Sequence, residues 1–208
     1  MIAGGRFFSH NFPVSFRIVL VLLLSLGAIG CAGLRPVFRQ SGPVADAQTR
    51  DWQKKIVQAG QDGDWLVIRG YNSADHLVAV AGNAELSHVG ILDATHGEVV
   101  EAVSPVVRAV PLRNFLNGAD RVLLIRPRDA NVQSGRTALS NARSQIGAPY
   151  DLMGPLGFPE KGKFYCSELA AWSAGMEVDR DGPAEVLHPA DMPKRGAVLF
   201  DSVWRRRP

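Results

Sequence analysis

The sequence predicts an α+β domain in which helices flank an antiparallel sheet. Two observations support this fold class. Segments with strand character cluster in the middle of the chain, and segments with helical spacing lie before and after them. A chain of 208 residues, 46% hydrophobic and 21% charged, has the composition of a globular protein and is long enough for one domain with its own core.

The first half of the domain is predicted to contain one helix and three strands. Trp52 and Ile56 recur at helical spacing in AQTRDWQKKIVQA, which predicts a helix over 47–59 that ends at the run GQDGD. The short run WLVIR is a strand, and an irregular stretch follows it. SHVGILD and EVVEAV are two more strands, joined by a tight turn around Thr95 to Gly97.

The second half is predicted to contain two strands and two helices. RVLLIR is a strand that Pro127 closes. A helix over 132–146 ends at Gly147, because glycine is favoured directly after a helix. A loop rich in glycine and proline follows. CSELAAWSAGM is then a helix that begins at Cys166, and GAVLFDSVW ends the domain as a strand.

The net charge does not indicate a nucleic-acid partner. The formal charge of +3 comes from 23 basic and 20 acidic residues. Arg6 and Arg17 lie in the first 30 residues, which contain no acidic residue, so setting these two aside leaves 21 basic residues against 20 acidic ones. We interpret the C-terminal run WRRRP as a solvated end. No basic stripe with interleaved aromatic residues occurs, which argues against nucleic-acid binding.

The N-terminus has the pattern of an export signal. Two arginines precede the uncharged run IVLVLLLSLGAIG, whose thirteen residues are fewer than the ~20 that a spanning helix needs. The small residues before Cys31 resemble the lipobox of bacterial lipoproteins. This implies cleavage of residues 1–30, lipid on Cys31, a tether over 31–46 and a domain over 47–208. An uncleaved membrane anchor is the alternative.

Both interpretations place the domain in the bacterial cell envelope, attached to a membrane. Ala32 follows the cysteine, and the sorting rule of Gram-negative lipoproteins then implies the outer membrane, with the domain on its periplasmic face. The chain has two cysteines in a compartment that permits disulfides. If Cys31 carries lipid, Cys166 has no partner, and such a thiol is either a buried core residue or a reactive group.

Cys166 lies where a helix start favours a thiolate. The N-terminus of a helix carries about half a positive charge and free N–H groups, which stabilise an anion. The same N–H groups can hold the oxyanion of an acyl-transfer reaction. The sequence therefore makes Cys166 a candidate nucleophile, and a small core residue is the alternative.

His88 is the candidate base for this cysteine. It lies in a strand whose other face is apolar, and an imidazole beside a helix-start cysteine forms the thiolate–imidazolium pair of cysteine hydrolases. A histidine satisfied within the core is the alternative. The other four histidines have other interpretations. His10 belongs to the signal segment, and His76 and His96 are expected to be exposed. His188 is interpreted as a structural residue and is kept as a reserve base.

Glu101 is the candidate orienting group for His88. A turn of even length, with Asp93 opposite Glu98, places Gly90 opposite Glu101. Glu101 is then the diagonal neighbour of His88 on the same sheet face, about 7–8 Å away between Cα atoms. A slip of one residue would remove this contact. A glutamate that faces solvent is the alternative.

The segment GAPYDLMGPLGFPEKGKFYCSEL resembles the core of the NlpC-type cell-wall cysteine peptidases, which have a papain-like fold. DGDWLVIRG resembles the Gly-Asp-Leu-Val strand of the same family. In common members the cysteine precedes the histidine, whereas here SHVGI comes first. This order, and YCSEL in place of DCSGL, is similar to the circularly permuted, YiiX-like branch.

The resemblance implies roles for matched residues. Cys166 corresponds to the nucleophile, His88 to the base and Glu101 to the third polar residue. Tyr150 corresponds to a tyrosine that lines the cysteine pocket, and Tyr165 replaces an aspartate of the common members, so both are expected to contact substrate. The resemblance requires no cofactor, and the absence of a Cys/His cluster with ligand spacing argues against a metal.

Together these observations predict an envelope lipoprotein that acts as a cysteine hydrolase. It is expected to cleave an amide or ester bond through a thioester on Cys166. The substrate is expected to be a peptidoglycan stem peptide, or an acyl-lipid or acyl-amide. A non-enzymatic envelope lipoprotein that binds a lipid or another ligand is the alternative.

Overall fold

The computed structural model describes most of the chain from residue 41 to residue 202. The expectations for the signal peptide 1–30, for Cys31, for the first part of the tether and for His10 and His76 lie outside the described residues. None of the helices in the described part combines the length and the apolar character needed to span a bilayer. The described residues are 41–72, 75, 78–79, 82, 84–178 and 186–202.

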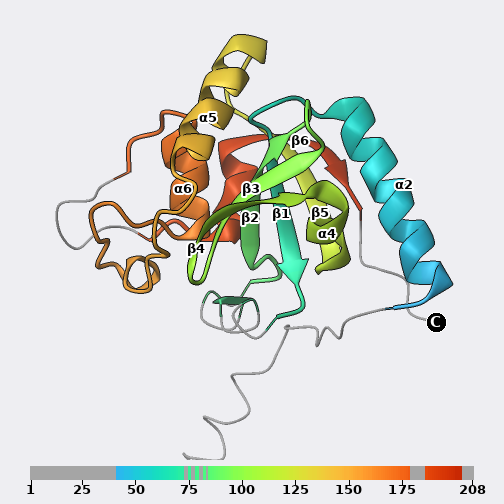
Figure 1. The fold of residues 1–208 in the computed structure, drawn as a ribbon, viewed down its shortest axis with the longest axis horizontal. Helices are drawn as coiled ribbons and strands as arrows, with labels where there is room; N and C mark the ends of the chain where they lie inside the picture. Colours follow the sequence, from blue (N-terminus) through green and yellow to red (C-terminus); the bar gives the residue numbers. More distant parts are fainter. Residues whose placement is uncertain are drawn as a thin grey trace, which may run out of the picture. The chain divides into compact units, whose positions relative to one another are not determined.

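The core of the fold is a six-stranded antiparallel sheet with the strand order β4-β3-β2-β1-β5-β6 (Figure 1). The α+β fold class with an antiparallel sheet is therefore as the sequence predicts. The strands are β1 (Trp65–Gly70), β2 (His88–Asp93), β3 (Glu98–Val103), β4 (Val106–Pro111), β5 (Ala119–Pro127) and β6 (Gly196–Asp201).

Helices cover both faces of the sheet. Figure 1 shows α2 on one side and α5 and α6 on the other. The helices are α2 (Pro43–Ala59), α4 (Leu112–Asn117), α5 (Val132–Ser144) and α6 (Cys166–Ser173), with the short 3₁₀ helices η1 (Gly154–Leu156) and η2 (Pro189–Arg195).

Alternation along β1 explains why both faces are apolar. Trp65 and Val67 belong to the core under α5 and α6, whereas Leu66 and Ile68 belong to the core under α2 and α4. Successive side chains of a strand point to opposite faces, so a central strand buried on both faces reads as a continuous apolar run. This accounts for the uninterrupted sequence WLVI.

Several predicted boundaries differ from the structure. Helix α2 begins at Pro43, so the last four residues of the expected tether belong to the domain; proline suits the first helical turn, and Ala45 is buried. Helix α5 ends at Ser144 and helix α6 at Ser173, earlier than expected. Strand β6 ends at Asp201, and residues 203–204 of the expected strand lie outside the described part.

The segment after β3 contains structure that the sequence analysis did not assign. The run VVRAVP forms β4, which pairs with β3 along its whole length, and α4 follows directly. A two-residue turn, Ser104 and Pro105, joins the two strands. The sequence does contain a signal for this hairpin, because two valine-rich runs of equal length flank the turn.

Candidate active site

Cys166 is the first residue of α6. Tyr165 precedes it in an extended conformation, with φ −94° and ψ 169°, and its backbone N–H donates to Glu168 Oε2 at 3.3 Å. A glutamate three residues into a helix commonly closes its start in this way. The first N–H groups of a helix have no acceptor within the helix, and Cys166 is the residue at which this end of α6 begins. Cys166 is 5% exposed and forms no disulfide.

Two hydrogen bonds beside the thiol hold the segment that leads into η2. Ser167 Oγ donates to the carbonyl oxygen of Leu187 at 2.6 Å. The N–H of Leu187 donates to the hydroxyl oxygen of Tyr165 at 3.2 Å. The residues on either side of Cys166 therefore both anchor the same distant segment, which fixes the start of α6 in the fold.

His88 links this helix start to the sheet. Its Nε2 lies 2.8 Å from Glu101 Oε2, and its ring is 5.9 Å, centroid to centroid, from that of Phe115. Cys166 also lies close enough to the imidazole to raise its pKa as a hydrogen-bonding and charged neighbour.

The contacts of His88 favour its charged form. Burial alone lowers the pKa of His88, but the hydrogen bonds to Cys166 and Glu101 raise it by more, so the net pKa is well above the usual value. An imidazole with this balance readily takes and holds a proton. A histidine next to a cysteine in this way is the pairing that cysteine nucleophiles use.

Glu101 is held from two sides. The strand register pairs Gly90 with Glu101, as the sequence analysis expected, and this brings the carboxylate to His88. Its other oxygen, Oε1, accepts from Arg108 Nε at 3.0 Å and Nη2 at 2.9 Å. Burial raises the pKa of Glu101, but the bonds to His88 and Arg108 lower it by more, so the carboxylate is ionised at neutral pH.

Arg108 is the residue of this cluster that the sequence analysis missed. It lies on β4 directly opposite Glu101, and its side chain is 53% exposed. A guanidinium that donates two hydrogen bonds to one carboxylate oxygen fixes the direction in which the other oxygen points. Arg108 therefore acts through Glu101 as a positioning residue.

Tyr150 lies close enough to Cys166 for the charge of that group to act on its hydroxyl. The segment around it runs along β4, where Val107 N–H donates to Ala148 O at 2.8 Å and Tyr150 N–H donates to Pro105 O at 2.9 Å. Burial, and then the negative charge at Cys166, raise the pKa of Tyr150 far above its usual value. The hydroxyl is therefore protonated at neutral pH and can donate a hydrogen bond.

Tyr165 has an internal partner. Its hydroxyl oxygen accepts the N–H of Leu187, and its ring is buried. Burial raises its pKa to about 12, although the Leu187 bond acts in the opposite direction. The structure thus gives Tyr165 an anchoring contact, and its expected contact with substrate stays a prediction.

Asp151 organises the loop between Tyr150 and α6. Its fully buried carboxylate accepts three backbone N–H groups, from Met153 at 2.9 Å, Gly154 at 2.7 Å and Glu160 at 2.7 Å. Buried charges need such partners. The sequence analysis assigned Asp151 no role, and its contacts indicate that it folds this loop.

The reserve base His188 has contacts on both ring nitrogens. Its Nε2 lies 3.1 Å from the carbonyl oxygen of Val78, and its Nδ1 accepts the N–H of Ala190 at 3.1 Å. The second contact caps the start of η2. His188 is thus placed to hold η2, as its interpretation as a structural residue expected.

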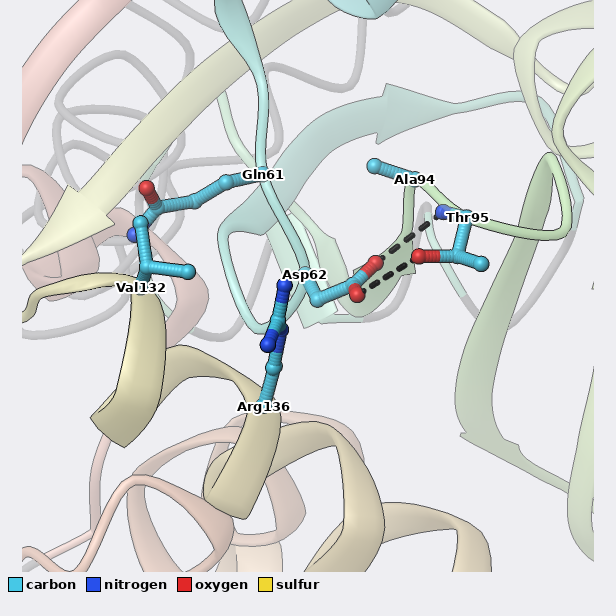
Figure 2. A pocket seen from close by; sticks show the side chains of 6 residues that line it. All are labelled: Gln61, Asp62, Ala94, Thr95, Val132 and Arg136. Atoms are coloured by element: carbon cyan, nitrogen blue, oxygen red, sulfur yellow. Dashed lines mark hydrogen bonds between the residues drawn. The ribbon is translucent and has the colours of Figure 1, made fainter.

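A separate pocket of about 270 Å³ lies near the start of α5 (Figure 2). The carboxylate of Asp62 lines this pocket and accepts hydrogen bonds from the Thr95 backbone N–H at 3.0 Å and from Thr95 Oγ1 at 2.8 Å. The pocket holds no candidate nucleophile, and none of the cluster around Cys166 lines it. Its lining residues are Gln61, Asp62, Ala94, Thr95, Val132 and Arg136.

Residues 61–202 match the protein family described as "Permuted papain-like amidase enzyme, YaeF/YiiX, C92 family". The chain belongs to this family. The resemblance to the permuted, YiiX-like branch is thereby confirmed, together with the permuted papain-like fold and the class of enzyme, a cysteine hydrolase. The curated proteins include no significant match.

A solved structure shares this fold. The crystal structure of the metalloprotein YiiX from Escherichia coli O157:H7 superposes with a TM-score of 0.54, at 20% sequence identity, over 72% of this chain and 99% of that one. The described residues of this chain contain no group of three or more His, Cys, Asp or Glu side chains placed to hold a metal ion. They do not fit a metal centre, and no step below uses one.

Glu101→Gln tests the charge at the centre of the cluster. The variant is expected to unfold at pH 7 with a free energy about 1–3 kcal/mol lower than wild type, because the glutamine loses the charge that faces His88 and Arg108. The pKa of Glu101 is lowered in the folded state, so the ionised carboxylate contributes stability above its unfolded value of 4.5. That contribution is lost as the pH falls through the folded pKa.

Urea unfolding of both proteins between pH 7 and pH 3 measures this difference. The two midpoints should converge in acid. Glu160→Gln is the control, because Glu160 forms an exposed pair with Lys163 and should change stability by less than about 1 kcal/mol. A difference between the two midpoints that stays constant with pH would contradict the assignment of the ionised Glu101 carboxylate as the stabilising group.

Proposed function

We propose that this protein hydrolyses an amide or ester bond in the bacterial envelope through a thioester on Cys166. The observation that carries the proposal is the continuous chain of contacts from Cys166 through His88 to Glu101 and Arg108, in a member of an amidase family. The roles of the individual residues follow from this geometry.

In the first step His88 takes the proton of the Cys166 thiol. The raised pKa of His88 supports this transfer, and Glu101 stabilises the imidazolium that results. The thiolate then attacks the carbonyl carbon of the substrate, and a carbon–sulfur bond forms. The carbonyl oxygen takes the negative charge of the tetrahedral intermediate.

Two groups are placed to stabilise that oxyanion. The first backbone N–H groups of α6, the helix that begins at Cys166, have no acceptor within the helix and can donate to an anion. The hydroxyl of Tyr150 remains protonated and lies close enough to feel the charge of Cys166. Each donor of this kind contributes about 10²–10³-fold to the rate in enzymes that form such intermediates.

The intermediate collapses when the bond to the leaving group breaks. His88 gives its proton to the departing amine or alcohol, and the acyl group stays on Cys166 as a thioester. Water then attacks the thioester, with His88 as the base that accepts its proton. The products are a carboxylic acid and the regenerated thiol, and no cofactor takes part.

Two substrate classes are compatible with this chemistry. A peptidoglycan stem peptide offers an amide in the expected compartment. An acyl-lipid or acyl-amide offers an ester or amide at a membrane. We further propose that the chain is a lipoprotein held at the outer membrane by lipid on Cys31. The uncharged run before Cys31 supports this attachment.

Alkylation of Cys166 tests the ion pair without a substrate. In a Cys31→Ser background Cys166 is the single cysteine. His88→Ala is expected to slow its reaction with iodoacetamide at pH 7 by about tenfold or more, because an isolated thiol is only a few per cent thiolate. Glu101→Gln should slow it less. His96→Ala, on the exposed turn, is the control, and equal rates in the His88 and His96 variants would refute the role of His88.

A substrate panel tests the reaction itself. The protein is incubated with purified sacculi and with acyl-lipids and acyl-amides, and products are read by mass spectrometry. One class should release a carboxylic acid, Cys166→Ala should release none, and His88→Ala should be about 10²–10⁴-fold slower. Folding of each variant is checked by circular dichroism. Product formation by Cys166→Ala would exclude the thioester route.

Cys31→Ser tests the proposed lipid attachment. The substitution removes the only thiol that could take the diacylglycerol, so the protein should leave the membrane fraction and lose the mass of the lipid. Fractionation and intact mass spectrometry measure both changes. Ala32→Ser, one residue later, is the control and should stay in the membrane fraction. Retention of Cys31→Ser on membranes with residues 1–30 still present in its intact mass would favour an uncleaved anchor.

A further inference from the structure

The loop between Tyr150 and α6 exposes a cluster of large apolar side chains. We call residues 152–158 the apolar loop. Four of the ten exposed large hydrophobic residues in the described part of the chain lie in these seven positions. Scattered apolar residues are normal on a surface, but contiguous ones indicate a contact. The four are Leu152 at 68% exposure, Met153 at 43%, Leu156 at 67% and Phe158 at 56%.

The backbone of the apolar loop is fixed from within. The Asp151 carboxylate holds the N–H groups of Met153, Gly154 and Glu160, and η1 forms one turn inside the loop. A side chain at Gly154 would collide with the ring of Tyr165, at 2.6 Å from Cδ1. The loop is therefore packed close on its inner side, and its apolar side chains are held outward.

The apolar loop is adjacent to the candidate active site. Asp151 N–H donates to the carbonyl oxygen of Phe164 at 3.0 Å, and Gly154 lies against Tyr165, which directly precedes Cys166. Figure 1 shows this segment projecting beside α6. An occupant of the apolar loop would thus lie next to the thiol.

We propose that the apolar loop inserts into the surface of a lipid bilayer and places Cys166 at the membrane interface. The docking itself does not depend on the chemistry of the thiol. Its consequence for the substrate rests on the proposed function: the carbonyl group that Cys166 attacks then belongs to an amphiphile in that interface.

The size of the cluster fits a bilayer better than a second copy of the chain. A stable protein interface buries about 800 Å² on each partner through roughly 20–30 residues. Seven residues with four outward apolar side chains do not supply this. Insertion of a few apolar side chains into the boundary between headgroups and acyl chains needs no matching surface.

Charge beside the apolar loop agrees with this occupant. Lys161 is exposed three residues after Phe158, and Lys163 forms an exposed pair with Glu160. A lysine can keep its ammonium group among anionic headgroups while its aliphatic stem lies along apolar surface. The expected lipid on Cys31 would hold the domain near the same membrane.

Tryptophan quenching in the full chain tests the proposal. Phe158→Trp and Val57→Trp are each reconstituted into vesicles of phosphatidylethanolamine and phosphatidylglycerol, with and without brominated acyl chains. Val57 is the matched control, because it is also 56% exposed but lies on α2, on the other side of the sheet. The N-terminal segment is identical in both variants, so its own attachment cancels.

The added indole at position 158 is expected to be quenched by bromine on the order of twofold, since interfacial segments lie roughly 5–10 Å into the headgroup–acyl boundary. The indole at position 57 should not be quenched, and Leu156→Ser added to Phe158→Trp should reduce the quenching. Equal quenching at both positions would overturn the proposal. So would a shielded indole at 158 that bromine does not quench, because protein would then cover the loop.

This readout is independent of the thiol. Quenching that fails while Cys166 still depends on His88 for its alkylation would reject membrane docking and leave the hydrolase intact. Quenching that succeeds while the alkylation test fails would reject the hydrolase and leave the docking.

Discussion

The half-buried hydrogen bond between His88 Nε2 and Glu101 Oε2 is the contact on which the candidate site depends. It joins neighbouring strands on one sheet face, and it exists because Gly90 pairs with Glu101. A slip of one residue would send Glu101 to the opposite face. The bond also commits Nε2 of the imidazole to Glu101, so the strand register fixes the orientation of the histidine ring.

Much of this arrangement is readable in the sequence, because it is encoded locally. The short turn after Asp93 sets the register of the hairpin, and the register places Glu101 beside His88. The start of α6 is marked by its helical spacing and by Glu168, three residues after Tyr165. Such signals need only a few neighbouring residues, so periodicity and turn chemistry suffice to find them.

The rest depends on contacts that spacing does not report. Arg108 belongs to the cluster only because β4 folds back along β3, and the sequence analysis had left that segment unassigned. Likewise, the carboxylate of Asp151 is satisfied by the backbone of a loop whose path no apolar period predicts. The contact between Tyr165 and Leu187 joins positions 22 residues apart.

The way Asp151 fixes its loop has a consequence for divergence within the family. The carboxylate holds backbone groups, and the close approach to Tyr165 requires a glycine at position 154. The outward residues contribute little to that scaffold. Relatives could therefore carry different side chains at the outward positions while the path of the loop stays the same. The loop could then recognise different surfaces in different relatives, next to the same cysteine.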